Sequence, residues 1–93
     1  MYRVKESKSF RRDVKRLEKS KRYDPRKLLE AMTILASGER LPEHYRDHAL
    51  KGDVDGSREC HIESDWLLVY RYQKGALILQ LIRTGTHSQL FHE

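Results

Sequence analysis

Three histidines, His48, His61 and His87, are the side chains of this 93-residue chain best suited to chemistry. His48 falls at the start of one predicted strand, His61 falls inside the next, and His87 follows the last. Neighbouring antiparallel strands bring residues on one face to within about 5 Å of each other. The imidazoles can therefore meet, and Asp65 and Arg83, at the ends of adjacent predicted strands, can join them.

Such a set is sufficient to cleave a phosphodiester bond in RNA. One group withdraws the 2′-hydroxyl proton, a second protonates the leaving 5′-oxygen, and a cation stabilises the charged transition state. A histidine on a strand is nevertheless more often a surface or structural residue than a catalyst. The spacing alone therefore predicts a candidate acid–base site and leaves a purely structural role open.

Metal binding is the competing interpretation of the histidines. His44 and His48 have the spacing of a helical zinc pair, but Pro42 lies beside them and no cysteine pair or metalloprotease-type glutamate completes a site. The run Asp53–Gly56 is similar to the start of a calcium loop, yet it lacks the bidentate glutamate that closes one, and a hairpin turn explains it better. We therefore expect no metal and no cofactor.

Cys60 and two aromatic residues are the remaining candidate functional residues. Cys60 could be a nucleophile, but its position in mid-strand beside His61 favours a small buried apolar residue. Trp66 and Phe91 lie outside the predicted helical core, and each can stack on an unpaired RNA base. Trp66 can equally pack in the core, and Phe91 can dock on the sheet.

Two helices are predicted in the first 40 residues to support these groups. Ser7 or Ser9 can cap the first helix. The second begins at Asp24-Pro25, a capping residue followed by proline, and ends at Gly38. Apolar residues at helical spacing are Phe10, Val14 and Leu17 in the first helix and Leu28, Leu29, Met32 and Leu35 in the second.

After Pro42 the apolar period changes from helical to two. We expect strands at about His48–Lys51, Arg58–Glu63, Trp66–Gln73 and Ala76–Thr84, with a weaker first strand at Tyr2–Glu6. The connections at 52–56, 64–65 and 74–75 are short, which favours an antiparallel meander. The predicted fold class is α+β, a single domain over residues 1–93 with two N-terminal helices packed on a small, mostly antiparallel sheet.

Composition and charge limit the classes of protein to which this chain can belong. The chain is 38% hydrophobic and 35% charged with one cysteine, which excludes a disulfide scaffold and argues against disorder. Residues 1–27 contain 12 of the 19 Lys and Arg but 4 of the 14 acids, a net of +8, whereas the remainder has a net of −3. Such a basic segment attracts polyanions such as nucleic acid, although the charges can also simply solvate helix faces.

The expected location is the cytoplasm. No apolar run approaches the length of a membrane span, and the first residues do not have the apolar run of a secretory signal. A lone cysteine also fits a reducing compartment.

Blocks of residues over 41–91 closely resemble the YafQ-type toxins of the RelE/ParE superfamily of bacterial toxin–antitoxin systems. The blocks are Leu41-Pro42, Tyr45–His48, Leu50, Gly52, Arg58–Ile62, Asp65–Tyr70, Arg83–His87 and Leu90-Phe91. Residues 1–40 agree only in helical character and basic charge. The resemblance implies a RelE-like, microbial-RNase-type fold and a ribosome-dependent endoribonuclease that cleaves the mRNA codon in the A site. In that family the cleavage needs no metal and uses the 2′-hydroxyl as nucleophile.

The family's functional positions fall on seven residues of this chain: His48, His61, Asp65, Trp66, Arg83, His87 and Phe91. The resemblance implies that His87 is the general acid, with base and positioning work shared by His48, His61 and Asp65. Arg83 would hold the scissile phosphate, and Trp66 and Phe91 would shape the mRNA path. The implied partners are a cognate antitoxin, acidic and partly disordered, together with the ribosome and mRNA. His92, just beyond the matched blocks, has no assigned role.

Two alternatives stay open. A ParE-like member of the same superfamily would share the fold and poison gyrase, but it lacks the histidine set that this chain has. A non-catalytic RNA- or DNA-binding module would keep the basic helices and would not need His87 or Asp65.

Overall fold

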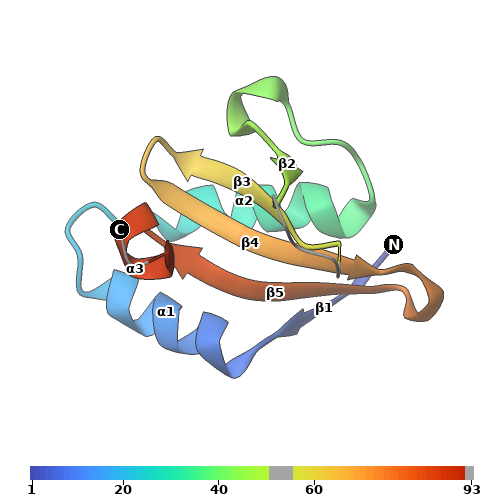
Figure 1. Cartoon of the computed structure of the whole chain (residues 1–93), viewed down its shortest axis with the longest axis horizontal. Helices are drawn as coiled ribbons and strands as arrows, with labels where there is room; N and C mark the ends of the chain where they lie inside the picture. Colours follow the sequence, from blue (N-terminus) through green and yellow to red (C-terminus); the bar gives the residue numbers. More distant parts are fainter. Residues whose placement is uncertain (51–55, 92–93) are drawn as a thin grey trace.

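The computed structural model describes residues 1–50 and 56–91, and Figure 1 shows the arrangement of its elements. In chain order these are β1 (Arg3–Glu6), α1 (Lys8–Glu18), α2 (Pro25–Ser37), the 3-10 helix η1 (Glu43–Tyr45), β2 (His48–Ala49), β3 (Arg58–Glu63), β4 (Trp66–Gln73), the 3-10 helix η2 (Lys74–Ala76), β5 (Ile78–Gly85) and α3 (His87–Phe91). The sheet order is β1-β5-β4-β3-β2. β1 runs parallel to β5 and every other pair is antiparallel, so the predicted α+β class and mostly antiparallel sheet are confirmed.

Both predicted N-terminal helices form, and their capping residues explain where they begin and end. Ser7, rather than Ser9, caps α1, since its Oγ accepts a 2.9 Å hydrogen bond from the backbone N–H of Phe10. Asp24 caps α2 in the same way, with proline at the first helical position. Gly38 ends α2 in the left-handed region at φ 84°, a conformation that glycine adopts without strain.

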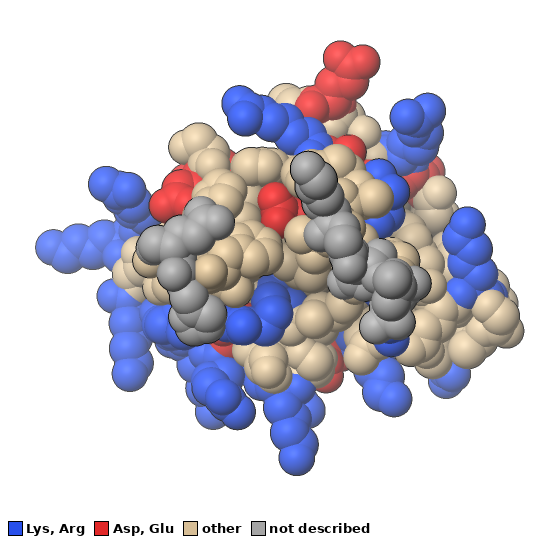
Figure 2. Space-filling view, viewed as in Figure 1, with Lys and Arg blue, Asp and Glu red and all other residues tan. Residues whose placement is uncertain are grey.

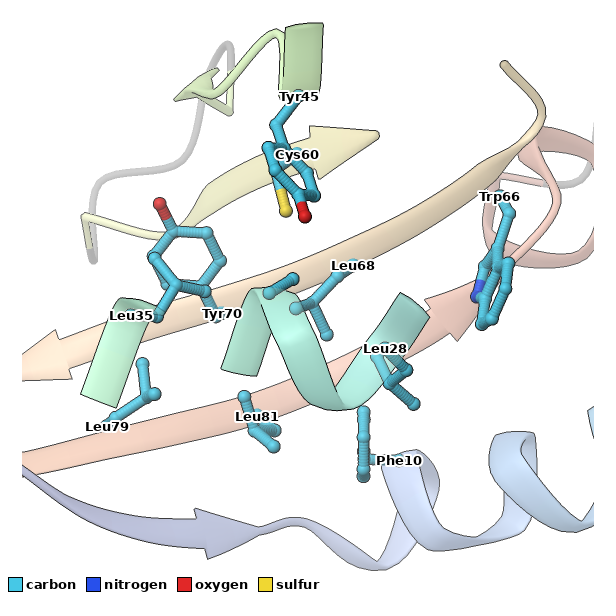
Figure 3. Packing of buried hydrophobic residues seen from close by; sticks show 11 residues of the cluster. Phe10, Leu28, Leu35, Tyr45, Cys60, Trp66, Leu68, Tyr70, Leu79 and Leu81 are labelled. Atoms are coloured by element: carbon cyan, nitrogen blue, oxygen red, sulfur yellow. The ribbon is translucent and has the colours of Figure 1, made fainter. Parts of the chain in front are cut away.

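The two helices cover one face of the sheet, and α2 lies behind the sheet in Figure 1. Figure 3 shows the core between them, which includes Phe10, Leu28, Leu35, Cys60, Trp66, Leu68, Tyr70, Leu79 and Leu81. The prediction that Leu29 belongs to this buried face is wrong, because its side chain is 61% exposed. Leu28, Ala31 and Leu35 form the inward stripe of α2, and Leu29 lies about 100° around the helix from Leu28.

A third helix, α3, packs on the opposite face of the sheet, in front of it in Figure 1. Its Leu90 contacts the apolar patch formed by Leu67 and Val69 of β4. The sequence contained its start signal, which is a Thr-x-x-Gln capping box. Thr86 Oγ1 accepts from the backbone N–H of Gln89 at 3.1 Å, and Gln89 Oε1 accepts from that of Thr86 at 2.9 Å.

Three strands differ from their predicted bounds, and β1 differs only in that it begins at Arg3 instead of Tyr2. β2 has two residues, and the predicted end at Lys51 lies outside the described residues, as do residues 52–55 of the predicted turn and calcium-like run. β5 begins at Ile78 instead of Ala76, because η2 occupies residues 74–76 and Leu77 adopts a left-handed conformation at φ 54°.

β1 is too short to pair with the whole of β5, so polar groups of the remaining β5 edge bond to the N-cap residue of α1 and to a side chain in the middle of that helix. Ser7 Oγ donates to the carbonyl of Ile82 at 2.8 Å. The Asp13 carboxylate accepts from the backbone N–H of Thr84 at 3.0 Å. These bonds fix α1 beside the end of β5, where Arg83 is located.

Candidate functional site

His48, His61 and His87 lie in a row. The ring centroids of His48 and His61 are 6.1 Å apart, and those of His61 and His87 are 5.7 Å apart. β2, β3 and the first residue of α3 supply one histidine each. The structure thus brings together the three imidazoles that strand spacing predicted to meet.

The short strand β2 is fixed by the residue before its histidine. The Asp47 carboxylate accepts from the Tyr70 hydroxyl at 2.5 Å and from the Arg58 guanidinium at 3.3 Å. The Nδ1 of His48 bonds to the carbonyl oxygen of Arg46 at 2.7 Å. Since that carbonyl can only accept, Nδ1 has the proton, and Nε2 is the atom directed at the site.

Glu59 is the buried acid of the row. Its Oε1 lies 3.5 Å from His48 Nε2 and 3.8 Å from His61 Nε2, and its side chain is 7% exposed. A buried carboxylate needs polar neighbours, and the Nε2 atoms of His48 and His61 lie within 4 Å of it on either side. Our sequence reasoning missed this residue, although Glu59 precedes His61 by two positions on one strand and therefore shares its face.

A metal ion has a better candidate site here than at the pair that the sequence suggested. His48, Glu59 and His61 each offer one ligand atom, and these atoms lie within 4.8 Å of one another. Two imidazoles and a carboxylate suit zinc or copper. His44 does not belong to this group, because its ring stacks on Tyr45 with the centroids 4.4 Å apart.

Asp65 orients His87 at the other end of the row. One carboxylate oxygen accepts from the His87 backbone N–H at 3.0 Å and lies 2.8 Å from His87 Nδ1. These two hydrogen bonds, with the charge of His87, hold the pKa of Asp65 below its usual value, so the carboxylate stays ionised. Nδ1 donates to Asp65, which leaves Nε2 of His87 to exchange a proton with a substrate.

Arg83 lies at the end of β5 and is tied to α1. Its Nε donates to Asp13 Oδ2 at 2.6 Å and its Nη2 donates to Asp13 Oδ1 at 3.1 Å. The hydrogen bonds to Asp13 raise the Arg83 pKa, and the side chain stays 33% exposed. Asp13, only 2% exposed, is a second residue that our sequence reasoning missed, although it interrupts the apolar stripe of α1 between Phe10 and Val14.

The two predicted RNA-binding aromatics differ in position. Phe91 is 38% exposed, and its ring lies 6.4 Å from that of His87. Trp66 is 6% exposed and packs in the core with its Nε1 donating to Thr84 Oγ1 at 2.9 Å (Figure 3). Trp66 therefore takes the core position that the sequence left open, and its ring offers little exposed surface on which a base can stack.

Cys60 is a core residue, as its strand position favoured. It is fully buried, and burial raises the pKa of its thiol to about 12. Since the thiolate is the reactive form, Cys60 is not a nucleophile at neutral pH.

Basic side chains surround this site. Figure 2 shows Lys and Arg along the lower and left margins of the face, over α1 and the segment that follows it, where residues 1–27 have their net charge of +8. In the described part of the chain, none of the helices has the length and apolar character needed to cross a membrane.

A family comparison matches residues 2–92 to the bacterial toxin YafQ of type II toxin–antitoxin systems. The chain belongs to the YafQ toxin family. The mRNA interferase toxin YafQ of Escherichia coli K12 is 38% identical over 89 residues, which cover 95% of this chain and 94% of the relative.

Solved toxin structures have the same fold. A metal-bound toxin from Helicobacter pylori is 41% identical and superposes with a TM-score of 0.92, over 98% of this chain and all of the other. The toxin in the E. coli DinJ–YafQ complex is 37% identical, with a TM-score of 0.88 over 98% of this chain and 99% of the other. The suspected family and its fold are therefore confirmed.

Proposed function

We propose that this YafQ-family chain is a toxin that cleaves mRNA in the ribosomal A site and so inhibits translation. The observation that supports this most is the row of three imidazoles, with His87 bonded to Asp65 at one end and His48 and His61 beside Glu59 at the other. Such a row offers a base and an acid on opposite sides of one phosphate. The name of the 38% identical E. coli relative, an mRNA interferase, agrees with this chemistry.

The proposed reaction is attack of the 2′-hydroxyl on the adjacent phosphorus. The base, at His48 or His61, removes the 2′-hydroxyl proton as the new O–P bond forms. The bond from phosphorus to the 5′-oxygen breaks, and His87 Nε2 gives its proton to that oxygen. The products are a 2′,3′-cyclic phosphate and a free 5′-hydroxyl, and the electrons and protons balance without a co-reactant.

Arg83 and Glu59 are the residues proposed to stabilise the groups that change charge during the reaction. Asp13 fixes the orientation of the Arg83 guanidinium, so its positive charge is already in place when charge develops on the phosphoryl oxygens. Glu59, whose Oε1 lies 3.5 Å from His48 Nε2 and 3.8 Å from His61 Nε2, can accept a hydrogen bond from the histidine that has just taken the 2′-hydroxyl proton.

The proposed chemistry uses no metal. Both proton transfers require an imidazole nitrogen with an available lone pair or proton, and a bound cation would occupy those same atoms of His48 and His61. A metal at this position is therefore expected to inhibit the reaction.

The proposed partners follow from charge. The basic N-terminal segment supports docking on ribosomal RNA, whose phosphates bind Lys and Arg without sequence specificity. A cognate antitoxin, acidic and partly disordered, would cover the same positive surface. The E. coli relative has been solved in complex with DinJ, which supports an antitoxin partner for this chain and its action in the cytoplasm.

Primer extension on mRNA from translating ribosomes tests the proposal. Wild type should produce cleavage aligned with codons, and His87→Ala should reduce the rate by at least about 100-fold, as for loss of a general acid. His44→Ala is the matched control, since His44 is exposed and outside the row. Absence of cleavage by wild type, with inhibition of gyrase instead, would favour the ParE-like alternative. RNA binding without either activity would favour the non-catalytic module.

A further inference from the structure

A small pocket opens beside the Asp65–His87 pair, and the catalytic row does not use it. It lies between the segment joining α1 to α2 and the turn joining β3 to β4, and its volume is about 120 Å³. That is less than the roughly 150 Å³ of an apolar cavity that encloses one benzene ring, so the pocket can take one edge of a planar base while the rest of the base stays in solvent. Its walls include Arg22, Tyr23, Glu63, Ser64, Asp65 and Trp66.

We infer that this pocket receives the base of the nucleotide on the 3′ side of the cleaved bond, and that Glu63 discriminates among the bases there. The inference rests on the proposed function, since it assigns a substrate subsite to that reaction. It adds to that function a position of base selectivity and the residue that determines it.

The pocket lies near His87, the proposed general acid, and this position indicates that the nucleotide on the 3′ side of the cleaved bond is the one that reaches it. His87 protonates the 5′-oxygen, which belongs to the nucleotide on the 3′ side of the bond. Asp65 bonds to His87 and also lines the pocket, whereas His48 and His61 continue the row away from His87. A nucleotide whose 5′-oxygen lies at His87 therefore has the pocket within reach of its base.

The walls suit a base and its phosphate. The rings of Tyr23 and Trp66 lie 5.3 Å apart, and together they form an aromatic side of the pocket. Trp66 is buried, so the exposed part of Tyr23 is the surface on which a base can stack. Arg22 lies close enough to lower the pKa of Asp65, and as an exposed cation at the same site it can contact a backbone phosphate.

Glu63 supplies the selectivity. Its carboxylate lines the pocket, and its Oε2 accepts from Lys27 Nζ at 2.7 Å, which fixes the position of the side chain. A carboxylate only accepts hydrogen bonds, so it favours a base with an exocyclic amino group. Adenine, cytosine and guanine have that group, whereas the one donor on the pairing edge of uracil, N3–H, lies between two carbonyl oxygens that a carboxylate repels.

Programmed ribosomes carrying four mRNAs, identical except for the base 3′ to the cleaved bond, test the inference. Wild type should cleave the three amino-bearing substrates faster than the uracil substrate by about tenfold or more, the usual discrimination of one base-edge contact. Glu63→Gln should reduce this ratio to about twofold, because an amide both donates and accepts. Lys27→Gln is the matched control, since it removes the same ion pair but keeps the carboxylate, and it should retain the preference.

A binding measurement gives a second readout that does not depend on cleavage. Trp66 is the only tryptophan of the chain and lines the pocket, so its fluorescence reports occupancy. Adenosine 5′-monophosphate should quench it saturably, uridine 5′-monophosphate should quench it less, and Tyr23→Leu should weaken the adenosine effect. Lys21→Gln, beside the pocket but not lining it, should leave the titration unchanged.

The outcomes separate the two proposals. If wild type cleaves none of the four mRNAs, the proposed function is wrong, and the nucleotide titration alone still decides whether the pocket binds a base. If wild type cleaves but shows no preference at this position, or if Glu63→Gln keeps the wild-type preference, the inference is wrong. Equal quenching by the two nucleotides overturns it as well.

Discussion

Each imidazole of the row lies beside an acid, and this pairing sets the chemistry at the scale of single residues. His87 bonds to Asp65, an exposed carboxylate, while His48 and His61 share the buried Glu59. His87 meets its acid through Nδ1, whereas His48 and His61 face Glu59 with Nε2. The two ends of the row thus differ in the ring nitrogen that faces the acid, although all three groups are histidines.

Asp65→Asn should lower the cleavage rate by up to about 100-fold, because the amide is a weaker acceptor for the two hydrogen bonds that orient His87. The hydrogen bonds from the backbone N–H and the ring of His87 lower the pKa of Asp65, so the wild-type carboxylate is ionised throughout about pH 5–8 and the variant should be slower across that whole range. Single-turnover cleavage measured across that range checks this, with Glu39→Gln as a control on a distant exposed acid. A wild-type rate for Asp65→Asn would mean that Asp65 does not orient the acid.

Zinc added to the apo protein should inhibit cleavage reversibly. His48, Glu59 and His61 offer ligand atoms within 4.8 Å of one another, and zinc on these atoms removes the base. Cleavage followed against zinc concentration measures the effect, and a chelator should restore the rate on intact ribosomes. Glu59→Gln should weaken the inhibition; equal inhibition of the variant and wild type would place the zinc elsewhere.

Cys60 should resist thiol reagents in the folded protein. With its pKa raised to about 12, only about one molecule in 10⁴ is a thiolate at pH 8, and the side chain is fully buried. A colorimetric disulfide reagent should react with no thiol in native buffer and with the one cysteine after unfolding in guanidinium. Rapid reaction of the native protein would contradict the buried position.

At the scale of the elements, Asp13 joins α1 to β5. It accepts hydrogen bonds from the Arg83 guanidinium, the Thr84 backbone N–H and the Arg16 side chain. β1 ends before this part of β5, so α1 supplies the acceptor that a neighbouring strand would otherwise provide. The same carboxylate thus closes an edge of the sheet and orients the cation of the proposed site.

Asp13→Ala should lower the free energy of unfolding by about 2–4 kcal/mol, because it leaves buried donors without their acceptor and removes one partner of a partly buried ion pair. Urea denaturation followed by circular dichroism measures the loss. Arg16→Gln is the matched control. It removes only a partly exposed ion pair to the same carboxylate and should cost less than about 1 kcal/mol. Equal effects of the two variants would show that the bonds to β5 contribute little.

At the scale of the whole molecule, the excess positive charge and the proposed catalytic histidines belong to different parts of the chain. The net of +8 in residues 1–27 belongs to β1, α1, the segment that joins α1 to α2 and the start of α2. The segment with the three site histidines has a net of −3 over residues 28–93. Long-range attraction to RNA therefore comes from one part of the chain and proton transfer from another. The fold brings the two together, since α1 lies beside the end of β5 that leads into His87.

Binding of a single-stranded RNA should weaken by about tenfold to a hundredfold as salt rises from about 50 to about 200 mM, as for a few phosphate contacts. Filter binding measures this. Replacing the exposed α1 residues Arg12 and Lys15 with glutamine should reduce the salt dependence. Lys74→Gln, on η2, should not. Binding that is independent of salt would contradict the electrostatic role of α1.

The sequence by itself determined the local structure and the type of chemistry. Caps and apolar spacing predicted both N-terminal helices, period-two alternation predicted the strands of the meander, and the histidines fell on neighbouring strands. These signals are local, because a cap acts within one turn and alternation within one strand. The capping box at Thr86 was equally local, and reading it would have predicted α3 as well.

Only the tertiary structure decided which acidic residues lie beside the histidines and Arg83, and which aromatic side chain is exposed enough to bind RNA. Alternation fixes which residues share a face of a strand but does not say which distant element covers that face. Asp13 and Arg83 are 70 positions apart, so no local pattern could pair them. Trp66 became a core residue because α1 and α2 cover its face of the sheet, whereas Glu59 faces the other side with His61. Side-chain burial depends on the packing of segments far apart in the chain, and local sequence patterns do not record that packing.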